Sequence, residues 1–242
     1  MKTISLPEGL AFIGDRAFDS CSHLTAVIIP KGVTSIRDRT FYDCDNLMTI
    51  MLPEGLTSIG NEAFMNCRSL KSIEIPDEVS FIGDNAFSDC SALETITMPK
   101  NLKSLGNRAF YKCKELRSIT LFEGLNSIGN EVFADCSGMT SVTLPEGLTS
   151  IGSNAFYYCS SLTSVIIPDG MKTIGFKAFH NCKRLTSITM PDSIFFIAWN
   201  AFEGCENVTI KANRGSEAWY WAIIFGFPHK YPDPPGIEQI LL

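Results

Sequence analysis

Nine cysteines at a constant interval are the residues whose type and spacing could do chemistry. They are Cys21, Cys44, Cys67, Cys90, Cys113, Cys136, Cys159, Cys182 and Cys205, each 23 residues after the last. A thiol can act as a nucleophile, a metal ligand or half of a disulfide. If the interval reflects stacked units, equivalent side chains run parallel and do not face each other, and single cysteines in a line cannot close a zinc tetrahedron. We therefore predict buried, unreactive core thiols.

Histidines and carboxylates give no stronger site. His23 and His180 would lie seven units apart, roughly 33 Å at about 4.8 Å per stacked strand, and His229 follows the repeats. One acidic column could share a calcium ion, with a solvated acidic strip as the alternative; it comprises Glu123, Glu146, Asp169 and Asp192. We predict no enzyme, no catalytic residue, no metal site and no cofactor. A glycan-degrading solenoid is a remote alternative, because it would need a convergent acid pair.

The bulk composition limits the partners. The chain has 242 residues, 45% hydrophobic and 19% charged, with a net charge of −6. This composition suits a folded core, and the negative charge argues against nucleic acid, whose phosphates need a basic face. No apolar run reaches the length of a membrane span or a signal peptide.

Other residues repeat with the cysteines. A phenylalanine precedes each cysteine by three positions, and a proline marks nearly every unit. In one unit the apolar positions are Leu116, Ile119, Leu121, Leu125, Ile128, Phe133 and Cys136. The first three predict a short strand, the next two an inward-facing pair, and Gly129 with Asn130 is expected to open a helical turn, with the asparagine capping N–H groups.

A unit of 23 residues is too small to bury its own apolar face, so neighbouring units must stack. The sequence therefore predicts an α/β solenoid of nine repeats with a parallel sheet along one face. We assign residues 1–207 to the solenoid and 208–242 to a C-terminal cap and tail of the same domain. Because Arg37 and Ala198 replace the repeat glycine, that position should not require a positive φ.

The pattern resembles the BspA-like, or Treponema-type, leucine-rich repeats of bacterial surface proteins. The matching unit is PEGLTSIGNEAFMNCRSLKSIEI, from Pro53 to Ile75, and the likeness extends over residues 3 to 205. A closing element G-S-x-A…A-x-x-x-G is matched by Gly215, Ser216, Ala218, Ala222 and Gly226. The resemblance implies a right-handed superhelix with a C-terminal helical cap, and an adhesin-like protein that binds host or matrix proteins.

The outward positions of the strands, expected to form a concave face, are mostly small and hydroxylic. Larger or charged residues stand out in repeats two to five, as interface anchors do: Ile28, Met48, Met51, Lys71, Glu74, Glu94 and Arg117. Ile166 stands out further along the chain. We predict that the first set binds a protein or glycan ligand. The alternative is an ion ladder linking Lys71, Glu94 and Arg117.

The C-terminal end is unusually aromatic. Phe176, Phe195, Phe196 and Trp199 occupy positions that are polar in other repeats. In the segment 216–227, Ser216 could cap a helix and Gly226 could end it. That helix is apolar on every side, so we predict an interface, with self-association as one use, at Trp219, Tyr220, Ile223 and Ile224. The alternative is that the tail, residues 229–242, folds over it.

The most probable function from sequence is therefore non-enzymatic protein binding, with a structural spacer or self-associating scaffold as the alternative. By resemblance the protein would be at the cell surface or secreted, as an excised piece of a longer chain. Unpaired cysteines would equally suit the cytoplasm.

Overall fold

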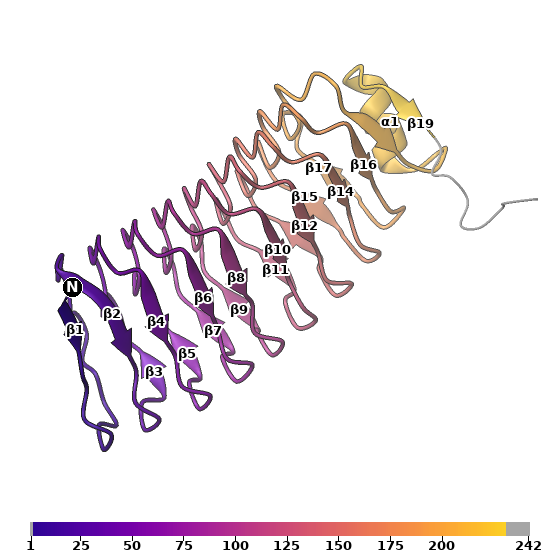
Figure 1. Cartoon of the computed structure of the whole chain (residues 1–242). Helices are drawn as coiled ribbons and strands as arrows, with labels where there is room; N and C mark the ends of the chain where they lie inside the picture. Colours follow the sequence, from indigo (N-terminus) through magenta and orange to yellow (C-terminus); the bar gives the residue numbers. More distant parts are fainter. Residues whose placement is uncertain (1, 231–242) are drawn as a thin grey trace, which may run out of the picture.

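The computed structural model describes residues 2–230 and confirms the predicted solenoid. Successive coils stack in one row from the N-terminal strand to a short helix at the other end (Figure 1). The repeat of 23 residues is visible in the pairing, since Ser118 lies opposite Ser141 and Ile119 opposite Val142.

The first row of strands is the predicted sheet face, and its strands are hydrogen-bonded in four successive groups. Its parallel strands follow one another along the stack: β1 (Lys2–Ile4), β2 (Leu24–Ile28), β4 (Thr49–Met51), β6 (Ser72–Glu74), β8 (Thr95–Thr97), β10 (Ser118–Thr120), β12 (Ser141–Thr143), β14 (Ser164–Ile166), β16 (Ser187–Thr189) and β18 (Thr209–Lys211). In β10 the central Ile119 is buried and both flanking residues are exposed. This alternation sends one side chain per strand into the core. We call the outward surface of these strands the strand face.

A second row of strands was not predicted. It consists of two-residue parallel strands: β3 (Ser35–Ile36), β5 (Ser58–Ile59), β7 (Phe81–Ile82), β9 (Ser104–Leu105), β11 (Ser127–Ile128), β13 (Ser150–Ile151), β15 (Thr173–Ile174) and β17 (Phe196–Ile197). The expected inward pair is confirmed, since Leu125 and Ile128 are buried. Two residues are too few to show an alternating pattern, so the sequence revealed the burial and not the strand.

The expected helical turn before each cysteine is wrong. Between Gly106 and Cys113 the chain forms turns whose N–H groups donate to the next coil, as from Phe110 to the carbonyl of Val132 at 2.9 Å. Arg108 and Lys112 adopt positive φ values of 56° and 61°, which aligns alternate N–H groups with the neighbouring coil. Bonding between coils satisfies these donors where a single helical turn would leave them unpaired.

Asparagine and aspartate at the turn also act between coils. The Asn107 side chain accepts a hydrogen bond from the backbone N–H of Asn130 at 2.8 Å, so the expected capping occurs across coils. The adjacent repeat glycine has no positive φ, as predicted. It is small because the coils approach closely: a Cβ at Gly83 would lie 2.6 Å from the Asn61 nitrogen.

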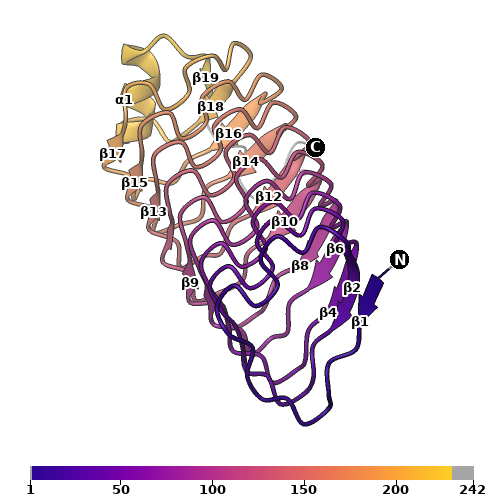
Figure 2. The ribbon, with the colours of Figure 1, turned by 90° about the vertical axis from the view of Figure 1, so that its left-hand side faces the viewer.

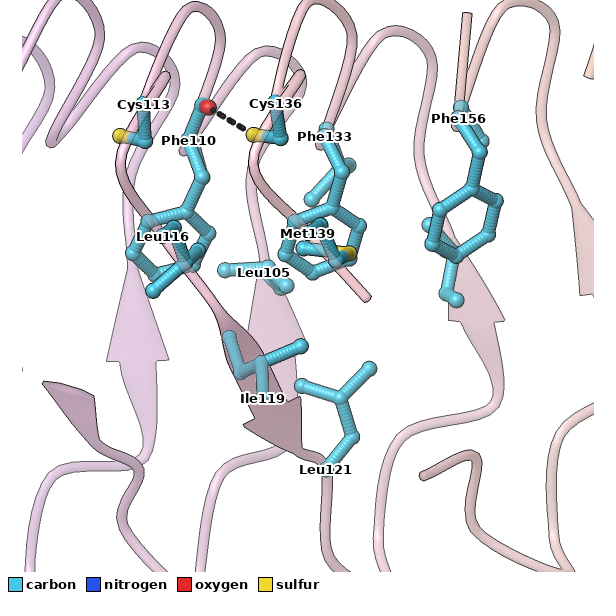
Figure 3. Packing of buried hydrophobic residues seen from close by; sticks show 14 of the residues in the cluster. Leu105, Phe110, Cys113, Leu116, Ile119, Leu121, Phe133, Cys136, Met139 and Phe156 are labelled. Atoms are coloured by element: carbon cyan, nitrogen blue, oxygen red, sulfur yellow. Dashed lines mark hydrogen bonds between the residues drawn. The ribbon is translucent and has the colours of Figure 1, made fainter. Parts of the chain in front are cut away.

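The core consists of ladders of identical side chains. Nine phenylalanine rings from Phe18 to Phe202 stack with centroids 5.1–5.6 Å apart and planes within 18° of parallel. Beside them each thiol from Cys44 to Cys205 donates to the phenylalanine carbonyl of the preceding coil, at 2.9–3.2 Å. Figure 3 shows the Cys136 thiol bonded to Phe110 in this way.

The predicted helical cap closes the C-terminal end. Helix α1 (Glu217–Ile224) begins at Ser216, whose side chain accepts the Trp219 N–H, and is followed by Gly226 at a φ of 73°. Trp221 meets the last stacked ring, Phe202, edge-on at 5.6 Å. The short strand β19 (His229–Lys230) then pairs with β18 and extends the first row by one strand.

Candidate functional site

The cysteines are core residues, as predicted. The eight from Cys44 to Cys205 are buried, and Cys21 in the first coil is partly exposed. Burial raises the pKa of the Cys44 thiol to about 12 and raises the pKa of Cys113 well above its ordinary value. A buried thiol that remains protonated is a poor nucleophile and a poor metal ligand.

Histidine and carboxylate side chains form no reacting pair. His180 stacks on Tyr157 at 5.0 Å, and its Nδ1 lies 3.4 Å from Glu203 Oε2. Burial lowers the pKa of His180. His23 lies in a distant coil, and its Nδ1 is 3.3 Å from the hydroxyl of its neighbour Ser22. These contacts fix the His180 ring against Tyr157 and Glu203, and they do not place a nucleophile within hydrogen-bond reach of a base.

The acidic column does not support the calcium alternative. Glu146, Asp169 and Asp192 line a cavity of about 560 Å³, and the Asp192 carboxylate accepts a hydrogen bond from Asn213 at 3.1 Å. Within residues 2–230, no group of three or more His, Cys, Asp or Glu side chains is placed to hold a metal ion. Glu123, Glu146, Asp169 and Asp192 are all exposed to solvent.

The predicted ligand-binding residues come together on the strand face. They form two columns on consecutive coils: Met48, Lys71, Glu94 and Arg117 in one, and Ile28, Met51 and Glu74 in the other. Ile28 and Met51 are direct neighbours in the sheet register and are 61% and 63% exposed. Met48 is 51% exposed. Ile28 and Met51 thus lie together, with Met48 exposed on the same coil as Met51, on a surface that elsewhere presents mainly serine and threonine.

The ion ladder that was the alternative explanation does not form. Arg117 pairs instead with Glu115 on its own coil, at 3.4 Å. In the described part of the chain neither Lys71 nor Glu94 takes part in an ion pair. Their charges are therefore available to a partner.

A cavity next to Ile28 was missed from the sequence. It has a volume of about 650 Å³ and is lined by apolar side chains and two charged ones, Glu8 and Lys31. Its apolar lining comprises Ile4, Leu6, Ile28, Ile29 and Pro30. The only signal was that Ile4 and Leu6 occupy inward positions of the first repeat. Because Ile28 lines it, the cavity extends the exposed apolar pair of Ile28 and Met51 toward the first coil.

The predicted interface residues of α1 differ in their surroundings. Trp219 is partly buried and its ring meets that of His229 at 4.4 Å, whereas Tyr220, Ile223 and Ile224 are exposed. The alternative is that the tail, residues 229–242, covers this helix; His229 contacts Trp219, and residues 231–242 lie outside the described residues. In the described range no helix has the length and apolar character needed to cross a membrane.

Comparisons with known proteins agree with the repeat. The family described as BspA type leucine rich repeat region matches in six copies, over residues 1–117 and 81–209. A leucine-rich repeat protein from Bacteroides ovatus is 34% identical with a TM-score of 0.77, over 86% of this chain and 55% of that one. The T. pallidum leucine-rich repeat protein is 28% identical with a TM-score of 0.61, over 76% of this chain and 77% of that one.

A third solved structure, a leucine-rich repeat protein from Eubacterium ventriosum, is 27% identical with a TM-score of 0.63, over 75% of this chain and 59% of that one. The chain thus spans little more than half the length of the B. ovatus and E. ventriosum proteins. A search of curated proteins finds no match.

Proposed function

We propose that this chain, which belongs to the BspA-type leucine-rich repeat family, is a non-enzymatic module that binds a protein ligand on its strand face between β2 and β10. The observation that supports this is the pair of exposed sheet neighbours Ile28 and Met51, of which Ile28 also lines an apolar cavity. Exposed apolar side chains packed next to a cavity are typical of the centre of a protein interface. Repeat scaffolds also commonly bind ligands along such an extended face.

The charges around this pair indicate the chemistry of the ligand. Lys71, Glu74, Glu94 and Arg117 follow the apolar pair on successive coils and carry both signs. A fitting ligand places an apolar side chain against Ile28 and Met51 and presents charges of alternating sign toward the later coils. A folded protein or an extended peptide can do both. A neutral glycan would leave the charged residues without partners, so a protein is favoured.

The place of action is part of the proposal. Resemblance to bacterial surface proteins supports an adhesin-like role at the cell surface, with host or matrix proteins as ligands. Burial of eight thiols is compatible with this location, because a buried thiol is protected from oxidation in an extracellular setting.

The test compares three variants of the purified chain for binding to a panel of matrix proteins, mucins and glycans. I28S/M51S removes the apolar anchor, and K71S/E94S/R117S removes the charges. I166S is the matched control, because Ile166 lies in the same column as Ile28 and Met51, is 74% exposed, and falls outside the proposed site.

We expect the chain to bind at least one protein of the panel, and the two site variants to weaken that binding at least about tenfold while the control does not. Equal binding by all variants would show that the strand-face site is wrong. Binding confined to glycans would refute the protein ligand. Hydrolysis of a polysaccharide, lost in E146Q/D169N, would refute the non-enzymatic assignment.

A further inference from the structure

The end of the solenoid opposite the proposed ligand site carries a second apolar surface. Phe176, Phe195, Phe196 and Trp199 are all substantially exposed, with Phe195 at 65% and Trp199 at 62%. Phe176 and Phe196 meet edge-on, with ring centroids 6.5 Å apart. In the other coils the equivalent positions are mostly serine, threonine, lysine, asparagine or aspartate. Phe12 and Phe81 stand at the Phe196 position in two other coils, but most coils carry no ring at these positions, so the rings are not a requirement of the repeat.

Helix α1 adds to the same end of the molecule. It packs against β17, the strand that carries Phe196, and the two lie together in Figure 2. Closing the core requires only Ala218, Trp221 and Ala222, which are buried. Four further apolar side chains of the helix and its end are exposed: Tyr220, Ile223, Ile224 and Phe225. We call these four, together with the four aromatic residues on and around β17, the terminal apolar surface.

The size of this surface exceeds what a monomer usually leaves in water. Its side chains are 43% to 73% exposed. With roughly 150–250 Å² for each aromatic side chain and less for isoleucine, about 800 Å² of apolar area faces solvent. The largest apolar patch on a typical monomer is about 300–600 Å². A stable interface buries about 800 Å² on each partner, so the surface is large enough for one.

The chemistry of the surface favours a second copy as its partner. None of its eight side chains is charged, so an oppositely charged ligand has nothing to recognise there. An apolar patch is self-complementary, which is the condition for a two-fold interface in which the same residues meet from both sides. Two exposed charged residues of opposite sign neighbour this surface. Lys172 is next to Phe195, whose N–H donates to the Lys172 backbone carbonyl at 3.1 Å, and Glu217 is the first residue of α1. Such charges can pair across a two-fold axis.

We propose that the terminal apolar surface is the interface of a two-fold symmetric homodimer. Two solenoids then meet at their C-terminal ends. The strand-face site between β2 and β10 lies toward the other end of the row and stays uncovered (Figure 1). The inference does not depend on that site, and each can be tested without the other.

Sedimentation equilibrium of the full chain over a wide range of concentration tests the proposal. We expect a monomer–dimer equilibrium for the wild-type chain and for I28S/M51S, the control at the opposite end. F195S/W199S and I224E should each raise the dimer dissociation constant at least about tenfold. These residues are exposed, so the melting temperature of the monomer should be retained. A mass of one chain at every concentration, or equal weakening by the control, would overturn the proposal.

Cross-linking identifies the occupant of the surface directly. A photoreactive amino acid is placed at Phe195, and the linked peptides are identified by mass spectrometry. Links to α1 or β17 of a second chain, confined to the dimer fraction, would support the proposal. Links within one chain to residues 231–242 would show that the tail occupies the surface, and links to a higher oligomer without two-fold symmetry would also refute the dimer.

Discussion

Replacing Phe110 by alanine tests whether the stacked rings hold the coils together. Phe110 is fully buried in the middle of the ladder and stacks on Phe87 at 5.4 Å and on Phe133 at 5.6 Å. Phe18, at the start of the ladder, is partly exposed and stacks only on Phe41 in the described structure. The same substitution at the two sites therefore removes two contacts in one case and one in the other.

The expected costs follow from these contacts. Truncating a buried phenylalanine in a core costs about 3–5 kcal/mol, because the lost burial is combined with a cavity that rigid neighbours cannot fill. Each ring pair contributes about 0.5–1.5 kcal/mol beyond its buried area. We therefore expect Phe110→Ala to lower the free energy of unfolding by about 3–5 kcal/mol. Phe18→Ala should cost about 1–2 kcal/mol, because part of that ring is already in water.

Urea unfolding followed by circular dichroism measures both variants. In a stack whose units contact only their neighbours, a lesion in the middle weakens the coupling between two halves. We therefore expect Phe110→Ala also to lower the apparent m-value as the transition broadens, whereas Phe18→Ala keeps the slope of the wild-type chain. Equal losses of stability at the two positions, or a loss below about 1 kcal/mol at Phe110, would refute the ladder as the source of cohesion.

Three other predictions follow from single contacts. A thiol reagent should label only Cys21 rapidly in the folded chain and the other eight thiols after unfolding, as counted by absorbance; rapid labelling of Cys44 would contradict its burial and its raised pKa. Asn107→Ala should lower the free energy of unfolding by about 1 kcal/mol, seen as a lower urea midpoint, because the Asn130 N–H loses its acceptor; an unchanged midpoint would count against this bond. The lowered pKa of His180 means that the folded chain binds this proton less readily than the unfolded chain. The stability that the neutral His180 ring contributes is therefore fully present above the unfolded pKa of about 6.5 and is lost as the pH falls below it. The melting temperature of His180→Gln should then decrease less between pH 7.5 and 5.5 than that of the wild-type chain.

The buried positions of each coil were predicted well from the sequence, because stacked coils need the same apolar residues at the same positions. Leu116, Ile119 and Phe133 recur at fixed intervals, and only a buried position in every coil would require that. The turns were mispredicted because Arg108 and Lys112 give no sign of a positive φ. Hydrogen bonds to the next coil offset the strain of that conformation. These bonds depend on the adjacent coil and not on the local sequence, so the local sequence does not reveal them.

The candidate surfaces were predictable only in part. Ile28, Met48 and Met51 could be identified as departures from a mostly hydroxylic face, and the structure makes Ile28 and Met51 direct neighbours. The adjoining cavity could not be foreseen, because its shape depends on how the first coil sits on the second. The ion ladder failed for a similar reason. Glu115 is two positions from Arg117 and reaches its guanidinium on the same coil, which a comparison of equivalent positions in different coils overlooks.

A stack of identical coils restricts where function can arise. Every inward side chain packs against the coils on both sides, so a change such as Phe110→Ala removes packing against two neighbouring coils at once. Outward positions are free of this constraint, and most carry serine or threonine. The stacking of the coils therefore does not require a large apolar residue at an outward position, and a group of such residues indicates contact with another molecule. Such residues gather beside Ile28 and around Trp199, at opposite ends of the row, whereas Phe12, Phe81 and Ile166 are exposed outside these two groups. Their separation is what allows one end to bind a ligand while the other associates with a second chain, so substitutions at the two ends should have independent effects.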